Sequence, residues 1–198
     1  MPKFSDNEKE AIRGRLFIEG ERLFALHGIK KVTVDELARA AGIAKGSFYA
    51  FYPGKEHLYM DIAAHLQDKI WEEMEGFLEE NRSLPPREMV KRCFMMMFDR
   101  IEKYPMLKQT DGETTDYLFR KLPPEIIEAH TRDDSRELLK LRKYGVHFTC
   151  RMDRAAKIMQ LLAIAFLSLP REDKAGSKAI METMLDGVLK EIVDDQRN

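Results

Sequence analysis

The segment from Thr33 to Phe51 restricts the fold of this chain more than any other, because it places two short helices around a glycine turn. The Thr33 hydroxyl can cap a helix start while Glu36, three residues on, bonds back to the threonine N–H. This helix must end near Gly42, since glycine permits the left-handed backbone of a tight turn. A second short helix is then expected over about residues 44–51. This is the geometry in which one helix braces another in the major groove of DNA.

The apolar residues of this segment favour the same interpretation. They fall where the two helices and the preceding one must meet in a core, and a small residue stands where the helices cross. An ordinary pair of packed helices is the alternative, but such a pair does not need this combination of residues. The predicted core residues are Leu37, Ala41, Ile43, Phe48 and Phe51, with Ala38 at the crossing.

The rest of the chain indicates an all-α fold of about nine helices. A first helix over about residues 8–27 carries one apolar stripe and ends at Gly28, and a long amphipathic helix follows the glycine-turn segment and ends before Ser83. No convincing strand and no internal repeat occur. We predict a helix-turn-helix domain over residues 1–55 and a larger helical domain over residues 56–198. Further helices are expected up to about Tyr104, from Pro124 to about Tyr144, over residues 158–169, and after Pro170.

The composition limits the class of protein. Of the 198 residues, 44% are hydrophobic and 34% are charged, which suits a water-soluble globular chain. No apolar run approaches the roughly 18 residues that span a bilayer, and the charged N-terminus is unlike a signal peptide, so we expect a cytoplasmic protein without a membrane partner. Residues 1–55 hold 10 basic and 7 acidic residues, net +3, against 23 and 27 in residues 56–198, net −4. The basic excess weakly favours a polyanionic partner for the first domain.

Polar residues around the second short helix are candidates for contact with DNA. Lys45, Gly46 and Ser47 stand at its front, the part of a recognition helix that reaches base edges. A solvated surface lysine is the plainer alternative for Lys45. Tyr49 can donate its hydroxyl to a phosphate oxygen, and Lys55 begins the next helix, whose free N–H groups attract phosphate. The predicted DNA-binding residues are Thr33, Ala44, Lys45, Gly46, Ser47, Tyr49, Tyr52 and Lys55.

The run TVDELARAAGIAKGSFYAFYPGKEHLY, preceded by a helix ending in LFALHG, resembles the DNA-binding domain of the TetR/AcrR family of bacterial transcriptional regulators over about residues 8–60. The resemblance implies a homodimer, usually a repressor, that binds a pseudo-palindromic operator, with a larger helical domain that binds an inducer and dimerises. It also implies phosphate contacts at Thr33, Tyr49 and Lys55. Where members often have His or Tyr followed by Phe, this chain has Phe51 followed by Tyr52. Phe51 cannot make the polar contact expected there, which leaves Tyr52 as the candidate.

The inducer pocket is expected in residues 61–198. Soft apolar side chains on neighbouring helices suit a hydrophobic molecule, so we expect an apolar or amphipathic small-molecule inducer, with acyl chains, aromatics and cationic drugs all admissible. Plain core packing is an equal alternative, because methionine commonly fills gaps in cores. The candidate pocket residues are Trp71, Met74, Phe94, Met97 and Phe98.

Two other functions have weaker support in the sequence. His147 and Cys150 lie three residues apart and, with Cys93, could form a metal or haem site, so a metal- or haem-responsive DNA-binding sensor is the alternative function. A partly exposed histidine and a buried thiol explain the same residues, and we predict no metal and no cofactor. An enzyme is disfavoured because the chain has no phosphate-binding glycine loop, HExxH or GxSxG. Glu113 and Asp116 are expected in an irregular stretch, in contact with solvent.

The last two predicted helices carry more apolar surface than one side of a domain can cover. Residues 158–169 are apolar nearly all round, and the final helix has an apolar stripe at four-residue intervals. Two subunits could pair these helices as a four-helix bundle, or both helices could be internal to one subunit. The candidate interface residues are Ile158, Leu162, Ala165, Leu169, Ile180, Met184, Val188 and Ile192.

Overall fold

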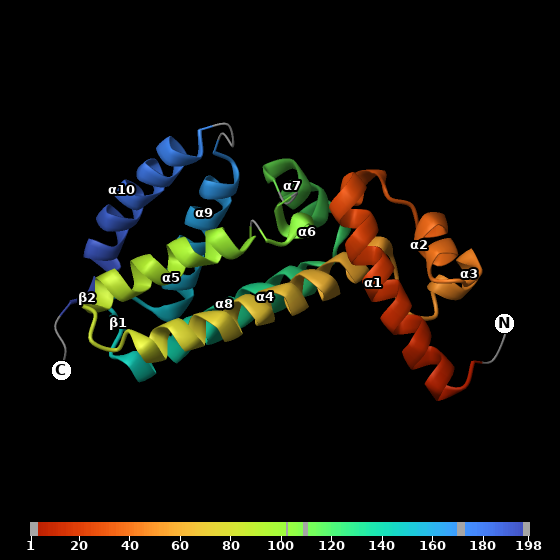
Figure 1. Cartoon of the computed structure of the whole chain (residues 1–198), viewed down its shortest axis with the longest axis horizontal. Coiled ribbons are helices and arrows are strands. Elements are labelled where there is room, and N and C mark those ends of the chain that lie inside the picture. The colour runs from red at the N-terminus through yellow and green to blue at the C-terminus, as the bar shows by residue number, and fades with distance from the viewer. Residues whose placement is uncertain (1–3, 102, 109–110, 170–172, 196–198) are drawn as a thin grey trace. The chain divides into compact units, whose positions relative to one another are not determined.

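A computed structural model of the chain describes residues 4–101, 103–108, 111–169 and 173–195. Within these residues the fold is all-α apart from one short strand pair, which confirms the predicted class (Figure 1). Ten α-helices and one 3-10 helix are present there, against the nine or so expected. The elements are α1 (Asp6–Lys31), α2 (Val34–Ala40), α3 (Lys45–Phe48), α4 (Lys55–Glu80), α5 (Pro86–Ile101), α6 (Pro105–Lys108), α7 (Gly112–Lys121), α8 (Pro124–Lys140), η1 (Leu141–Tyr144), β1 (His147–Phe148), α9 (Met152–Leu167), α10 (Lys174–Ile192) and β2 (Val193–Asp194).

The chain divides into two compact units. The first comprises Met1–Gln67 and Tyr104–Leu122, and the second comprises Asp68–Lys103 and Pro123–Asn198. The division falls inside α4, twelve residues beyond the boundary drawn from the sequence at residue 55, and it assigns α6 and α7 to the first unit. No described helix is both long and apolar enough to cross a bilayer.

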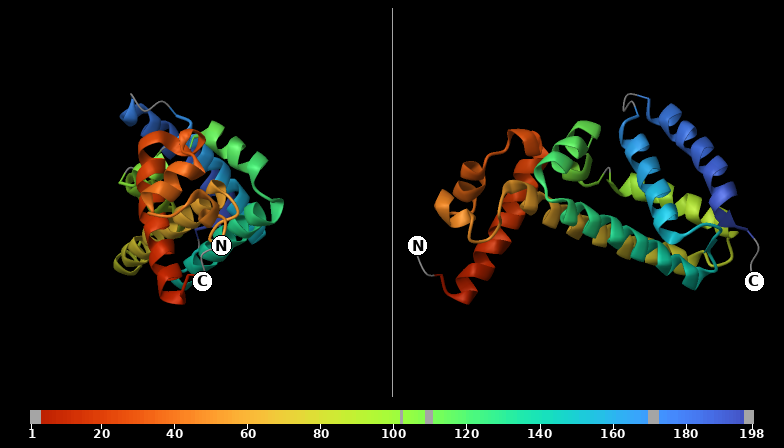
Figure 2. Two further views of the ribbon diagram at one scale, coloured as in Figure 1. Left: turned by 90° about the vertical axis from the view of Figure 1, so that its right-hand side faces the viewer. Right: turned by 180° about the vertical axis from the view of Figure 1, so that it is seen from behind.

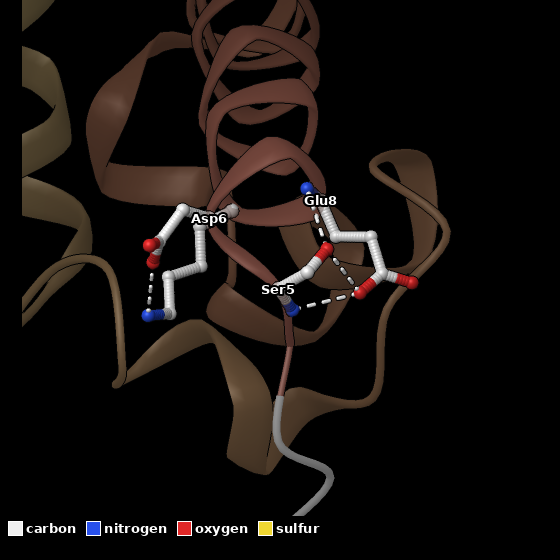
Figure 3. Close-up of polar contacts among 4 residues, drawn as sticks. Ser5, Asp6 and Glu8 are labelled. Carbon is white, nitrogen blue, oxygen red and sulfur yellow. Dashed lines mark hydrogen bonds and ion pairs between the residues drawn. The ribbon is translucent and has the colours of Figure 1, made fainter.

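Helix α1 begins with a capping box formed by Ser5 and Glu8 (Figure 3). The Ser5 hydroxyl accepts a hydrogen bond from the Glu8 N–H at 3.3 Å, and the Ser5 N–H donates to the Glu8 carboxylate at 2.8 Å. At Gly28 the backbone leaves helical geometry, with φ of 71°, which confirms the predicted helix end, although one more turn runs on to Lys31. The buried residues of α1 are Ile12, Leu16, Gly20, Leu23, Phe24 and Ile29.

Helices α2 and α3 pack next to α1 as the sequence predicted (Figure 1). The predicted capping box is confirmed: the Thr33 hydroxyl accepts from the Glu36 N–H at 3.2 Å, and the Thr33 N–H donates to the Glu36 carboxylate at 2.8 Å. Gly42 has a φ of 71°, the left-handed conformation that the turn requires. Of the predicted core, Leu37, Ala38, Ala41 and Phe48 are buried, while Ile43 and Phe51 are half-buried.

The first part of α4, together with α6 and α7, completes the first unit. A Cβ at Gly20 would lie 3.0 Å from side-chain atoms of Leu58 and Ile62, so α1 and α4 cross closely here. The expectation of an irregular stretch around Glu113 and Asp116 is wrong, because both residues lie on α7. The carboxylate of Asp111 accepts a hydrogen bond from the Thr114 N–H at 2.7 Å and caps this helix.

In the second unit, α5 contacts α10 and α8 contacts α9, and α9 and α10 lie side by side (Figure 2, right). Arg87 on α5 donates to the carbonyls of Val193 at 3.0 Å and Lys190 at 3.3 Å, which satisfies acceptors at the end of α10. Antiparallel pairing joins His147 to Asp194 and Phe148 to Val193, so the expectation of no strand is wrong. Each strand has two residues, too few to show an alternating pattern.

Candidate nucleic-acid interface

The front of α3 is an open, exposed surface. Ala44, the N-cap residue, and Lys45 and Gly46 in the first turn are all exposed. A Cβ added at Gly46 would meet nothing within 4 Å, so another molecule can approach the backbone there. Ser47 differs from its neighbours, since its side chain is only 8% exposed, and the predicted contact between Ser47 and DNA bases has no open surface to act through.

Tyr49 follows α3 and remains available to a partner. Its side chain is 53% exposed, and its ring stands edge-on to Phe48, with 5.7 Å between the ring centroids. Phe48 is fully buried, so it supports the tyrosine ring from below while the phenol keeps its exposed surface. This arrangement suits the predicted donation of the Tyr49 hydroxyl to a phosphate oxygen.

Thr33 is exposed, but its hydroxyl already makes two hydrogen bonds within the protein, one as acceptor and one as donor. It accepts from the Glu36 N–H and donates to the Glu36 carboxylate at 2.8 Å. The hydrogen bonds that the Thr33 hydroxyl and the Thr33 N–H donate to the Glu36 carboxylate lower the pKa of Glu36 below its ordinary value, which keeps this carboxylate charged. A phosphate at Thr33 therefore competes with the carboxylate for the hydroxyl proton.

Tyr52 does not lie on this surface, which corrects the prediction of a phosphate contact. Its side chain is 7% exposed, and its hydroxyl donates to the Asp61 carboxylate at 2.7 Å. Burial, and then the bond to Asp61, raise the pKa of Tyr52. The aromatic ring packs into the core near Phe48, and this apolar contact is what turns the phenol inward.

Lys55 is half-buried and its ammonium has partners within the protein, which does not favour a phosphate clamp, so that role stays a prediction. Its ammonium donates to the carbonyls of Ile29 at 2.7 Å, Lys30 at 3.3 Å and Val32 at 2.6 Å. Three bonds use all three donors of an ammonium group. Burial lowers the pKa of Lys55, an effect that the neighbouring Glu56 opposes. The first backbone N–H groups of α4 remain the phosphate-attracting feature at this place.

Arg15 holds the turn before α3 in place and was missed in the sequence. Its Nε donates to the carbonyl of Ala41 at 2.9 Å, which links the middle of α1 to the end of α2. Nothing in the sequence separates this arginine from the solvated charges beside it on the same helix. Before the turn, Arg39 on α2 is paired with Asp35 at 2.8 Å, whereas Lys45 after the turn makes no ion pair among the residues that the structure describes.

The predicted pocket residues differ in burial, and the cavity that they were expected to line remains a prediction. Met74 and Phe94 are buried, Trp71 and Met97 are half-buried, and the Phe98 side chain lies outside the description. A pocket of about 210 Å³ in the second unit includes only Trp71 of this set. Its lining residues are Asp68, Trp71, Glu72, Glu75, Glu137 and Lys140.

The residues considered for a metal site are not brought together. His147 is exposed on β1, Cys150 is half-buried, and Cys93 is buried on α5. Burial raises the pKa of the Cys93 thiol to about 12, so this group stays protonated and unreactive. Within the described residues, no three His, Cys, Asp or Glu side chains are placed to hold a metal ion.

Part of the predicted dimer surface is exposed. Ile180 and Met184 on α10 are 50% and 40% exposed, and Leu161 on α9, absent from the predicted set, is 53% exposed. Ile158, Ala165, Leu169 and Val188 are half-buried. Leu162 and Ile192 are buried within the second unit, where they pack in its own core, so their predicted contact with a second subunit has little exposed surface.

Comparison with known proteins places the α3 surface in a family. Residues 19–62, from α1 into α4, match the family described as bacterial regulatory proteins, tetR family. The uncharacterized HTH-type transcriptional regulator YerO of Bacillus subtilis is 30% identical over 93 residues, 47% of this chain and 31% of YerO. The HTH-type transcriptional repressor KstR2 of Mycobacterium tuberculosis is 27% identical over 92 residues, 46% of this chain and 45% of KstR2. The matches thus span less than half of either relative.

Two solved structures share the fold over most of the chain. RolR in complex with resorcinol has a TM-score of 0.65 at 20% identity and covers 93% of this chain and 90% of its own. FadR of Thermus thermophilus, a TetR-family repressor in complex with lauroyl-CoA, has a TM-score of 0.57 at 22% identity, over 90% of this chain and 93% of its own. At such identities the likeness concerns the fold. The capped helix pair, the glycine turn and the family match of residues 19–62 confirm the predicted resemblance: this segment of the chain is similar to bacterial regulatory proteins of the tetR family.

Proposed function

We propose that this chain is a transcriptional regulator that binds duplex DNA through the front of α3. The observation that carries the proposal is the exposure of Lys45, Gly46 and Tyr49 around a helix whose other side is anchored by the fully buried Phe48. Lysine suits the acceptors of guanine in the major groove, and the phenol suits a phosphate oxygen. Contact through the first N–H groups of α4 would add a second phosphate site. Because the proposed partner is genomic DNA, the proposal includes a location in the bacterial cytoplasm.

The proposal includes a homodimer formed through α9 and α10. Exposed apolar side chains at Leu161, Ile180 and Met184 would be covered by the same surface of a second copy. A two-fold dimer spaces its recognition helices by about 34–36 Å or a multiple, so it binds a pseudo-palindromic site on one face of the duplex. Repression is the proposed outcome, in line with the name of KstR2.

A small-molecule inducer bound by the second unit is the remaining part of the proposal. Two structures with this fold are complexes with ligands, resorcinol for RolR and lauroyl-CoA for FadR, which supports a ligand in the helical second unit. The sequence favoured an apolar or amphipathic molecule. The pocket around Trp71 is lined mainly by carboxylates, so it does not support an apolar ligand at that place. An inducer acts only if it binds one arrangement of the protein more tightly than the other.

Selection of bound sequences from a pool of random duplex DNA tests the proposal. We expect wild-type protein to enrich a two-fold symmetric motif whose half-sites are one helical turn or a multiple apart. The selection is then repeated in the presence of acyl chains and aromatic compounds. Enrichment without symmetry would remove the dimeric part of the proposal, and failure to enrich any duplex would remove the function.

A further inference from the structure

Helix α7, from the middle of the chain, contacts the place where α1 ends and α4 begins. We call this place, residues 29–33 and 54–56, the α1–α4 junction. Glu113 on α7 pairs with Lys30, with 2.6 Å between the carboxylate oxygen and Nζ. Tyr117, one turn further along α7, donates its hydroxyl to Glu56 at 2.5 Å, and its ring centroid lies 5.8 Å from Nζ of Lys55. Helix α7 thus contacts both the end of α1 and the start of α4.

Lys55 is the centre of the α1–α4 junction. Because Gly28 breaks the helix, the carbonyls of Ile29, Lys30 and Val32 lack the acceptor roles of a continuing helix, and the Lys55 ammonium bonds all three. A positive charge at the end of a helix is also favoured by the helix dipole. The Tyr117 ring shields this partly buried ammonium from water and attracts it through its π face.

The α1–α4 junction connects two segments of the proposed DNA surface. Val32 directly precedes Thr33, the N-cap of α2, and α2 braces α3. Lys55 and Glu56 form the start of α4, where the proposed phosphate-binding N–H groups lie. A change at the junction therefore alters the spacing between the start of α2 and the start of α4, and this spacing decides whether α3 and α4 can reach one duplex together.

We propose that Tyr117 is a positioning residue for DNA binding, acting through Lys55 and Glu56. Its ring keeps the ammonium on the carbonyls that end α1, and its hydroxyl fixes the start of α4. The inference rests on the proposed function, because positioning has meaning only if α3 and α4 bind DNA. It extends that function to a helix outside the segment of residues 19–62 that matches the family.

Plain packing is the competing explanation for Tyr117, and the chain offers a matched control for it. In the second unit, the Tyr144 hydroxyl donates to Glu79 at 3.0 Å, and the Arg82 guanidinium lies 5.0 Å from the Tyr144 ring centroid. The chemistry is the same, but the contacts join the end of α4 to η1 and do not involve the α1–α4 junction.

The experiment compares Tyr117→Leu, Tyr117→Phe, Tyr144→Leu and wild-type protein. Fluorescence anisotropy measures binding to a duplex selected by the wild type and to the unselected random pool, at a temperature where circular dichroism shows every variant folded. Hydrogen exchange compares amides of residues 30–36 with those of residues 12–24. We expect Tyr117→Leu to bind both duplexes about tenfold more weakly, through loss of a cation–π contact and a hydrogen bond, and to exchange faster only over residues 30–36. Tyr117→Phe keeps the ring, so about threefold weaker binding is expected.

The outcomes separate this inference from the function on which it rests. If wild-type protein binds neither duplex, the result contradicts both the proposed function and the positioning role of Tyr117. If the wild type binds and Tyr117→Leu binds equally well, or if Tyr144→Leu weakens binding as much, only the positioning role is overturned. Should Tyr117→Leu fail to fold, Tyr117→Phe decides: wild-type affinity with unchanged exchange over residues 30–36 overturns the inference, and weaker binding with faster exchange supports it.

Discussion

The hydroxyl of Tyr52 donates a hydrogen bond of 2.7 Å to the carboxylate of Asp61, which ties the segment after α3 to α4. Tyr49, three residues earlier, keeps 53% of its side chain exposed, against 7% for Tyr52. Two tyrosines that look equivalent in the sequence thus differ in role. Tyr52 stabilises the fold, whereas Tyr49 has an exposed phenol that is available for the proposed contact with DNA.

Replacing Tyr52 by Phe should lower stability without changing DNA binding. The variant keeps the buried ring but loses one hydrogen bond to a carboxylate that water can rehydrate, so the free energy of unfolding should fall by about 1 kcal/mol. Urea denaturation measures this loss, and anisotropy with a selected duplex should give the wild-type dissociation constant.

The pH dependence of that difference supplies a control. Because the pKa of Tyr52 is raised on folding, its stabilising contribution is complete below the ordinary tyrosine value of about 10 and is lost as the pH rises above it. The stability gap between the wild type and Tyr52→Phe should therefore be constant from neutral pH to about pH 9 and shrink at higher pH. A gap that grows with pH would show that burial does not favour the protonated phenol.

The change Tyr49→Phe should have the opposite pattern. The hydroxyl is not used within the described structure, so the free energy of unfolding should stay the same, while binding to DNA should weaken by about 1 kcal/mol for one lost hydrogen bond to phosphate. Parallel urea and anisotropy measurements on both tyrosine variants give a direct comparison. Equal affinity of Tyr49→Phe and wild type would remove Tyr49 from the interface.

The variant Lys55→Met tests whether the Lys55 ammonium stabilises the fold or contacts a DNA phosphate. Its ammonium bonds the carbonyls of Ile29, Lys30 and Val32, so the substitution should destabilise the fold by about 1 kcal/mol. The slope of log affinity against log salt should stay at the wild-type value, because no ammonium–phosphate contact is lost. A slope smaller by about one would restore the phosphate contact that the sequence predicted.

The proposed dimer surface is tested by Met184→Glu. A carboxylate at this exposed position would leave the fold of each subunit intact but would be buried on association, which is costly for an unpaired charge. Light scattering should therefore report monomers that bind the selected duplex weakly. The control is Leu139→Glu, an equally exposed apolar site on α8, which should keep the wild-type mass. A dimer with Glu at residue 184 would contradict the proposed surface.

The sequence predicted the helix-turn-helix segment closely because its signals are local. The capping box at Thr33 and Glu36 and the left-handed turn at Gly42 depend on residues at most three positions apart. The same reasoning missed α6 and α7, since a single turn after Pro105 and a ten-residue helix capped by Asp111 resemble a broken loop in sequence.

Side-chain roles that depend on distant partners could not be read from the sequence. The direction of Tyr52 is set by Asp61 and by packing near Phe48, and the bonds of Lys55 are set by carbonyls 23 to 26 residues earlier in the chain. The sequence showed the apolar stripe of α10, but it did not show which residues of the stripe face the core. Only contact with α5 and α9 separates the buried Ile192 from the exposed Ile180.

The most direct test of the central claim is the specificity ratio of Lys45→Ala, the affinity for a selected duplex divided by that for the random pool. Lys45 is exposed at the front of α3, and we propose that it contacts base edges in the major groove. We predict that the substitution lowers this ratio by a factor corresponding to about 1–3 kcal/mol while the melting temperature is unchanged. A ratio equal to that of the wild type would contradict the claim that the front of α3 reads DNA.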